Sequence, residues 1–310
     1  MNIPNKYPVY DVSGQLSSGA VEYLGSKYKG WVTLKLDDKK LRVLFKQGRP
    51  GTGENWAEKV TCELAQLLGL PHALYDLAKL EDTLCVISPN FLVDGDELRL
   101  GNELIEGFDK DQKFKNSAHT LDAIFKALRD NKVQLLEASK QKSPIREASD
   151  LFIGYLCFDA WIGNTDRHAE NWGIVTKYRM TNQIINVLAP TFDHASSLGR
   201  NESDKKRIER LQTKDEGFNV TAYVKRAPIP IYDNKGQALN TISLIQACKQ
   251  YSPQATHFWV NKITKVMGNN EKIKEIFDRI PNDFITTPAK DFAMAILNNN
   301  AERLRELQND

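Results

Sequence analysis

The feature that most limits the fold of this 310-residue chain is a change of hydrophobic period near residue 55. Before it, three segments alternate apolar and polar side chains and contain β-branched residues, which predicts strands at 20–24, 30–36 and 41–46. Residues 55–68 instead repeat apolar side chains at helical spacing, and Gly69 is a typical helix stop. Residues 82–88 predict a further strand. The first part of the chain therefore predicts a small α+β unit.

Beyond about residue 102 the pattern becomes mainly helical. Residues 120–130 and 148–163 predict amphipathic or buried helices, and 184–190 predict a short apolar strand. From residue 241 onward, helical segments are separated by short loops. We therefore expect a bilobal α+β chain with a β-rich N-lobe at residues 1–100 and a mainly helical C-lobe at 101–310.

Composition excludes several classes of protein. The net charge of +2 gives no basic field, so we expect no direct nucleic-acid partner. The N-terminus has no apolar signal region and no apolar run is long enough to span a bilayer, which indicates synthesis in a cytoplasm. The four cysteines are far apart and form no metal-binding pattern, so buried free thiols in a reducing compartment are expected.

The segment WIGNTDRHAENWGIV, residues 161–175, places many polar groups between bulky apolar residues. It contains Asp166 and Asn171, and Asp193 follows after the next apolar strand. Phosphoryl transfer from ATP needs one carboxylate to receive the acceptor proton, and an amide oxygen and a second carboxylate to hold Mg²⁺. This order is that of protein kinases. Each of these residues alone would indicate only a polar cap of a helix or turn. Together they favour a kinase.

The N-terminal part offers matching partners. Lys46 ends a predicted strand, and Glu58 on the following helix could pair with it, although a lone lysine at a strand end is usually a surface residue. LGSKYKGW carries Gly25, Lys29 and Gly30 between two strands, where backbone and ammonium groups could bind phosphate. It fits neither GxGxxG nor the Walker pattern, and an ordinary hairpin loop explains it equally well.

Four segments resemble those of the HipA-like serine/threonine kinases. The catalytic and metal-binding segments of that family resemble GNTDRHAENWGI and LAPTFDHASSLG, the helix with the lysine-pairing glutamate is similar to AEKVTCELAQLLGL, and the phosphate loop G-x-x-x-K resembles GSKYK. The matches run in family order from about Gly25 to Gly199. The last third of the chain matches only in being helical.

The resemblance implies a protein-kinase-like fold that binds ATP and Mg²⁺. Asp166 would be the catalytic base, and Asn171 and Asp193 would be the Mg²⁺ ligands. Nucleotide binding would involve Gly25, Lys29, Lys46, Glu58, Ser88, His168, Asn171 and Asp193, with Ser88 in the adenine hinge at residues 87–89. His168 has a second reading of equal weight, a structural histidine bonded to a backbone carbonyl.

The resemblance is to the short members that lack an extra N-terminal subdomain, including small toxin kinases and secreted bacterial effector kinases. It implies a protein substrate with a serine or threonine acceptor, an antitoxin partner, and a bacterial cytoplasm or export into a host cell without a cleavable signal. Some members silence themselves by phosphorylating a serine three residues before the loop glycine. Here that position is Glu22, which leaves Ser26 and Ser17–Ser18 as substitutes.

Two alternatives remain open. A lipid or small-molecule kinase would use the same machinery, and a kinase fold without activity would be a binding module. The presence of Asp166, Asn171, Asp193 and Lys46 argues against the inactive module, which needs none of them. Residues 204–233 are rich in charge and contain prolines. They lie where kinases place an activation or substrate loop, and the other reading is a long solvated loop.

Overall fold

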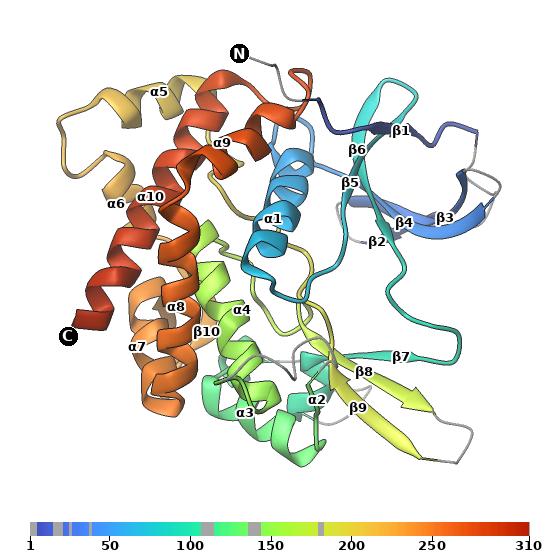
Figure 1. Ribbon diagram of the computed structural model, residues 1–310, viewed down its shortest axis with the longest axis vertical. Helices are drawn as coiled ribbons and strands as arrows, with labels where there is room; N and C mark the ends of the chain where they lie inside the picture. Colours follow the sequence, from blue (N-terminus) through green and yellow to red (C-terminus); the bar gives the residue numbers. More distant parts are fainter. Residues whose placement is uncertain are drawn as a thin grey trace.

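The computed structural model describes residues 5–14, 21–24, 27–36, 39–106, 115–135, 144–178 and 183–309 (Figure 1). In these ranges the strands are β1 (Val9–Asp11), β2 (Val21–Leu24), β3 (Lys27–Leu36), β4 (Lys39–Gln47), β5 (Asp76–Leu80), β6 (Thr83–Pro89), β7 (Glu97–Leu100), β8 (Gly173–Tyr178), β9 (Ile184–Leu188), β10 (Pro228–Tyr232) and β11 (Ala238–Asn240). The helices are α1 (Glu54–Leu68), α2 (Gly101–Glu106), the short 3₁₀ helix η1 (Asn116–Ala118), α3 (Leu121–Asp130), α4 (Ala148–Ile162), α5 (Asp204–Gln212), α6 (Val220–Lys225), α7 (Thr241–Tyr251), α8 (Pro253–Met267), α9 (Asn270–Arg279) and α10 (Thr287–Asn309).

A six-stranded sheet and helix α1 form the N-terminal part, which we call the small lobe. The strand order is β1-β5-β6-β4-β3-β2. β1 runs parallel to β5, and the other neighbouring pairs are antiparallel. In this register Lys46 of β4 lies opposite Lys29 of β3 on one side and Val86 of β6 on the other. The central position of β4 fixes the backbone of Lys46 from both sides.

Helix α1 lies between the sheet and the helices of the C-terminal part (Figure 1). It begins at Glu54, and Gly69 ends it with a left-handed φ of 60°, a conformation that glycine adopts without steric cost. The helix contacts β5 and β6 on one side and α8 and α9 on the other, so most of its side chains are buried. Packing on two sides fixes the position of Glu58 on this helix.

The remaining chain, the large lobe, is built around α4. This helix is buried along nearly its whole length by α7, α8 and α10. A Cβ on Gly154 would lie 2.4 Å from the indole ring of Trp259, so only glycine allows this approach. Gly163 ends α4 with φ 65° and opens the polar turn, residues 163–172. The buried helix thus delivers the polar turn to the cleft at a fixed position.

A three-stranded antiparallel sheet, β7-β8-β9, brings two distant segments together. β8 begins directly after the polar turn, and β9 ends directly before the loop at residues 189–199. Ile174 at the start of β8 pairs with Leu188 at the end of β9. Because the strands are antiparallel, the polar turn and the 189–199 loop emerge at the same end of this sheet.

One hydrophobic core joins the two lobes. Trp56 and Val60 of α1 belong to the same buried cluster as Phe152 of α4, Trp259 of α8 and Ile276 of α9. A second, smaller cluster covers the other face of the six-stranded sheet and includes Val32, Val43, Phe45, Cys85 and Ile87. The alternation of strand residues between the two clusters follows the period of two that predicted these strands.

The bilobal α+β expectation is confirmed, with a sheet-rich first part and a mainly helical second part (Figure 1). The expectation of a loop at residues 204–233 was wrong. This segment forms α5, α6 and β10, and Ser203 and Asn219 cap the two helices through their side chains. The apolar repeat that predicts a helix is absent from the buried face of α5, because its buried residue is Arg207.

None of the described helices combines the length and apolar character that crossing a membrane would require. All four cysteines are buried and free, as expected from their spacing.

Candidate active site

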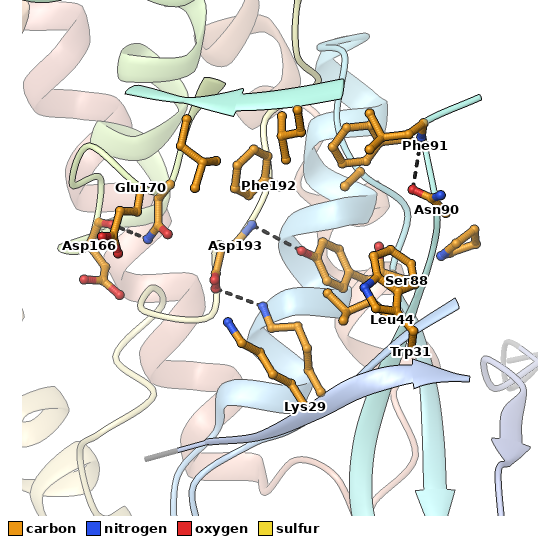
Figure 2. Close-up of a pocket in the computed structure, with 18 of the residues that line it drawn as sticks. Lys29, Trp31, Leu44, Ser88, Asn90, Phe91, Asp166, Glu170, Phe192 and Asp193 are labelled. Atoms are coloured by element: carbon orange, nitrogen blue, oxygen red, sulfur yellow. Dashed lines mark hydrogen bonds and ion pairs between the residues drawn. The ribbon is translucent and has the colours of Figure 1, made fainter. Parts of the chain in front are cut away.

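A cavity of about 600 Å³ lies between the six-stranded sheet and the polar turn (Figure 2). This volume is typical of sites for small molecules. Its walls bring together predicted residues that are far apart in the sequence: Lys29, Lys46, Ser88, Asp166, His168, Asn171 and Asp193. Glu58 lies behind the wall and reaches the cavity through Lys46. Gly25 lies outside the described residues, as do Ser17, Ser18 and Ser26.

The ammonium group of Lys46 is held by carboxylates from two other elements. Its Nζ donates to Oε1 of Glu58 on α1 at 2.5 Å and to Oδ1 of Asp193 at 2.9 Å. The Lys46 and Glu58 side chains are almost fully buried. Burial opposes the charge of Lys46, but the carboxylates of Asp193 and Glu58 outweigh it and hold the pKa of Lys46 well above its ordinary value. Lys46 is therefore a fixed positive charge in the cavity.

The backbone at Asp193 has an unusual conformation that its neighbours stabilise. Asp193 has φ 57°, which short polar residues tolerate better than others. Its N–H donates to the Tyr75 hydroxyl at 3.2 Å, and the next N–H, of His194, donates to Oε2 of Glu58 at 2.9 Å. Burial raises the pKa of Tyr75, so its hydroxyl stays neutral. Glu58 thus positions both Lys46 and the chain that carries Asp193.

The polar turn is closed by its own side chains. The N–H of Asp166 donates to Oδ1 of Asn164 at 3.1 Å, and Nδ2 of Asn171 donates to the carbonyl oxygen of Asp166 at 2.6 Å. The Asp166 carboxylate is half-exposed at the cavity, and its Oδ2 accepts a hydrogen bond from Oγ of Ser196 at 3.1 Å. Its position suits a base that receives a proton from a bound molecule.

His168 lies beside this carboxylate. Its Nε2 is 3.7 Å from Oδ1 of Asp166, which is too long for a hydrogen bond. Its Nδ1 accepts from the backbone N–H of Glu170 at 3.2 Å and therefore does not donate to a backbone carbonyl. The alternative of a structural histidine bonded to a carbonyl is therefore not the arrangement found. His168 lines the cavity instead.

Arg167 anchors the polar turn, and the sequence reasoning missed it. It is fully buried and donates to both carboxylate oxygens of Asp159 on α4, at 2.6 and 2.9 Å. It also donates to Oγ1 of Thr191 at 2.8 Å and to the carbonyl oxygen of Asn171. The available signal was Asp159 itself, a carboxylate in the last, otherwise apolar turns of the helix, because a buried charge requires a partner.

The other end of the cavity is apolar and aromatic. Trp31, Leu44 and Phe91 line it, and Figure 2 shows them on the side away from Asp166 and Glu170, with Phe192 between the two sides. The rings of Phe91 and Phe192 are stacked with centroids 6.2 Å apart. Such walls suit a flat, uncharged ring. Only the hinge at 87–89 was expected here, and Ser88 and Pro89 do line this end.

Asn171 and Asp193 bring oxygen donors for a cation to the wall of the same cavity. The described residues contain no group of three or more His, Cys, Asp or Glu side chains that could hold a metal. Mg²⁺ at phosphate sites needs fewer, because one or two protein oxygens, water and phosphate complete its shell. Asp193 supplies a carboxylate, and the hydrogen bond of Asn171 uses its amide nitrogen, so a cation would bind the amide oxygen. These residues fit Mg²⁺.

Solved structures that share this fold include two bacterial proteins. The proinflammatory kinase CtkA of Helicobacter pylori aligns with a TM-score of 0.72 and 19% identity, over 97% of this chain and 98% of that one. HipA of a Shewanella oneidensis MR-1 toxin-antitoxin system, solved with HipB and operator DNA, aligns with a TM-score of 0.51 and 11% identity, over 96% of this chain and 69% of that one. Comparison with curated proteins gives no match. Residues 23–287 match the HipA-like C-terminal domain, and the chain therefore belongs to the HipA-like C-terminal domain family.

Proposed function

We propose that this protein is an ATP- and Mg²⁺-dependent serine/threonine protein kinase of the HipA-like group. One observation carries the proposal. Lys46 is fixed between Glu58 and Asp193 on one wall of a cavity whose opposite side presents the Asp166 carboxylate. A phosphate-binding cation and a proton acceptor that face one cavity are what transfer of a phosphoryl group to a hydroxyl requires.

We propose a single orientation for ATP in this cavity. The adenine ring would lie at the aromatic end, against Trp31 and Phe192. The phosphates would extend along the side that carries Lys29 and Lys46. Asn171 and Asp193 would hold Mg²⁺, which when bound neutralises phosphate charge.

Asp166 would act on the acceptor. Its carboxylate accepts a hydrogen bond from the acceptor hydroxyl and takes its proton as the oxygen attacks the γ-phosphorus. The bond from that phosphorus to the bridging oxygen breaks, and ADP leaves. The fixed charge of Lys46 stabilises the phosphate oxygens during the transfer.

The protein nature of the acceptor is supported by family membership, since the same geometry serves kinases of lipids and small molecules. The HipA neighbour belongs to a toxin-antitoxin system and was solved with HipB. By analogy we propose that an antitoxin protein binds this chain. A toxin or effector role belongs to the same proposal.

The test is transfer of radiolabelled phosphate from ATP in the presence of Mg²⁺. Bacterial lysate proteins, mixed lipid vesicles and free sugars are offered as separate acceptors, and labelled protein is hydrolysed to identify the phosphorylated amino acid. We expect label on serine or threonine, and a loss of about 10²–10⁴-fold in rate for Asp166→Asn, which keeps the size of the side chain but removes the base.

Each alternative predicts another result. Label in lipid or sugar alone would make the protein a lipid or small-molecule kinase. ATP binding without transfer to any acceptor would make it a binding module. An Asp166→Asn variant as fast as the wild type would show that Asp166 is not the base.

A further inference from the structure

A chain of polar side chains leads from the small lobe to Asp166. Glu54, at the start of α1, is 2% exposed and accepts from the guanidinium of Arg200 and from Arg49. Nη2 of Arg200 donates to Oγ of Ser196 at 2.8 Å. Ser196 Oγ in turn lies 3.1 Å from Oδ2 of Asp166. Ser196 and Arg200 thus link the Asp166 carboxylate to α1, the helix that also carries Glu58.

The chemistry of these groups fixes the direction of each hydrogen bond. An arginine side chain has only donors, so Ser196 must accept the bond from Arg200. A serine hydroxyl carries a single proton, which is then directed to Oδ2 of Asp166. Arg200 therefore makes Ser196 a donor to the carboxylate.

Arg200 is itself held firmly. It is 8% exposed and paired with buried Glu54, and its carbonyl oxygen accepts from the N–H of Gly53 at 3.0 Å. A buried ion pair of this kind contributes little to stability, but it fixes geometry. Both the guanidinium and the backbone of Arg200 are tied to the first turn of α1.

We infer that Ser196 and Arg200 are positioning residues that orient the Asp166 carboxylate for proton transfer, an inference that rests on the proposed kinase activity. Oδ2 is engaged by Ser196, and Oδ1 is the oxygen that receives the acceptor proton. A rotation of the carboxylate would misplace Oδ1 without changing the residues that contact the nucleotide.

Ser197 offers a matched control. It is the adjacent residue, is also buried, and its Oγ donates to the carbonyl oxygen of His194 at 2.7 Å rather than to Asp166. Ser196→Ala and Ser197→Ala remove the same atom from the same loop. Only the first removes a hydrogen bond to the base.

The experiment measures kcat, the KM for ATP and the melting temperature of both variants. For Ser196→Ala we expect a loss of roughly 10- to 100-fold in kcat, the scale of a misplaced catalytic group, with an unchanged KM for ATP. Ser197→Ala should keep the wild-type kcat. Equal losses in the two variants, or a loss in Ser196→Ala that appears in KM alone, would assign Ser196 to the loop's structure and overturn the inference.

A double-mutant cycle gives an independent test. If Ser196 acts through Asp166, adding Ser196→Ala to Asp166→Asn should cause no further loss of rate, whereas independent effects would multiply. Multiplying losses overturn the inference. An active wild type with an equally active Ser196→Ala variant overturns the inference alone, and a wild type that transfers no phosphate overturns the proposed function and the inference with it.

Discussion

Asp159 of α4 and Arg167 of the polar turn form an ion pair in which neither side chain is exposed to solvent. The two hydrogen bonds run from Nε and Nη2 to the two carboxylate oxygens, a bidentate arrangement that fixes orientation as well as distance. Arg167 also donates to the Asn171 carbonyl and to Thr191. A single buried cation therefore joins the core helix, the polar turn and the segment before Asp193.

The first prediction concerns this pair. Asp159→Ala leaves Arg167 buried without its counter-ion, and we expect the free energy of unfolding to fall by about 3–5 kcal/mol in chemical denaturation. The double variant Asp159→Leu with Arg167→Met should recover much of the stability, because both charges are gone. Phosphotransfer should stay low in it, since Asn171 and Thr191 lose their donor. Wild-type stability of Asp159→Ala would contradict the assigned role of the pair.

The second prediction concerns Lys46. Lys46→Met should weaken ATP binding by roughly 10- to 100-fold, because hydrogen bonds to charged groups contribute about 1.5–3 kcal/mol. It should also lower the melting temperature, since Glu58 is buried and loses its counter-ion. Adding Glu58→Gln should restore the melting temperature but not the ATP affinity measured by calorimetry. Wild-type ATP affinity in Lys46→Met would show that Lys46 has only a structural role.

The third prediction concerns the cation. If Asn171 and Asp193 hold Mg²⁺ against the phosphates, ATP affinity should fall by about tenfold or more when EDTA removes the metal, since phosphate charge is then less neutralised. Asp193→Asn should make the affinity nearly independent of Mg²⁺. Calorimetric titrations with and without Mg²⁺ measure both effects. Equal affinity of the wild type under the two conditions would rule out the metal assignment.

The fourth prediction concerns pH. Burial lowers the pKa of His119 from 6.5 to about 4. Nε1 of Trp172 donates to Nε2 of His119, so the neutral ring donates from Nδ1 to the Pro230 carbonyl, and a second proton would break the bond to Trp172. Between pH 6.5 and about 4 the unfolded chain binds a proton that the folded chain does not. Stability therefore falls as pH falls through this range.

The size of this effect is measurable. From pH 7 to pH 5 His119 should account for a loss of about 2 kcal/mol, calculated from the two pKa values. His119→Gln can accept from Trp172 without titrating, so its unfolding free energy should fall by that much less over the same pH change. Denaturant titrations of both proteins at the two pH values provide the comparison. Parallel pH dependence would remove His119 from the acid response.

The helices and strands that depend on the pattern of neighbouring residues could be predicted from the sequence. Helix α1 follows from its helical periodicity and α4 from its long apolar run, and each ends at a glycine. The order of Asp166, Asn171 and Asp193 along the chain singled out three residues that line one cavity, and their chemical roles stay predictions. The supports of these residues could not be predicted, because they are made by tertiary contacts. Nothing in the spacing pairs Asp159 with Arg167, or connects Glu54 with Arg200 146 positions later.

The sequence also failed to predict very short strands and helices whose buried face is charged. β1 has three residues and is defined only by its pairing with β5, so no periodicity marks it. Helix α5 carries Arg207 on its buried face, where hydrogen bonds to the carbonyls of Gly199 and Arg200 replace apolar packing. A pattern based on hydrophobicity cannot recognise such a face.

The core that runs through both lobes has a consequence for how the chain unfolds. Because Trp56 and Val60 of the small lobe share a cluster with Phe152 and Trp259 of the large lobe, neither lobe can lose its packing alone. A chain cut between the lobes would leave two fragments that each expose half of this cluster. We therefore expect one cooperative thermal transition, and a nucleotide bound in the cleft should shift that whole transition to higher temperature.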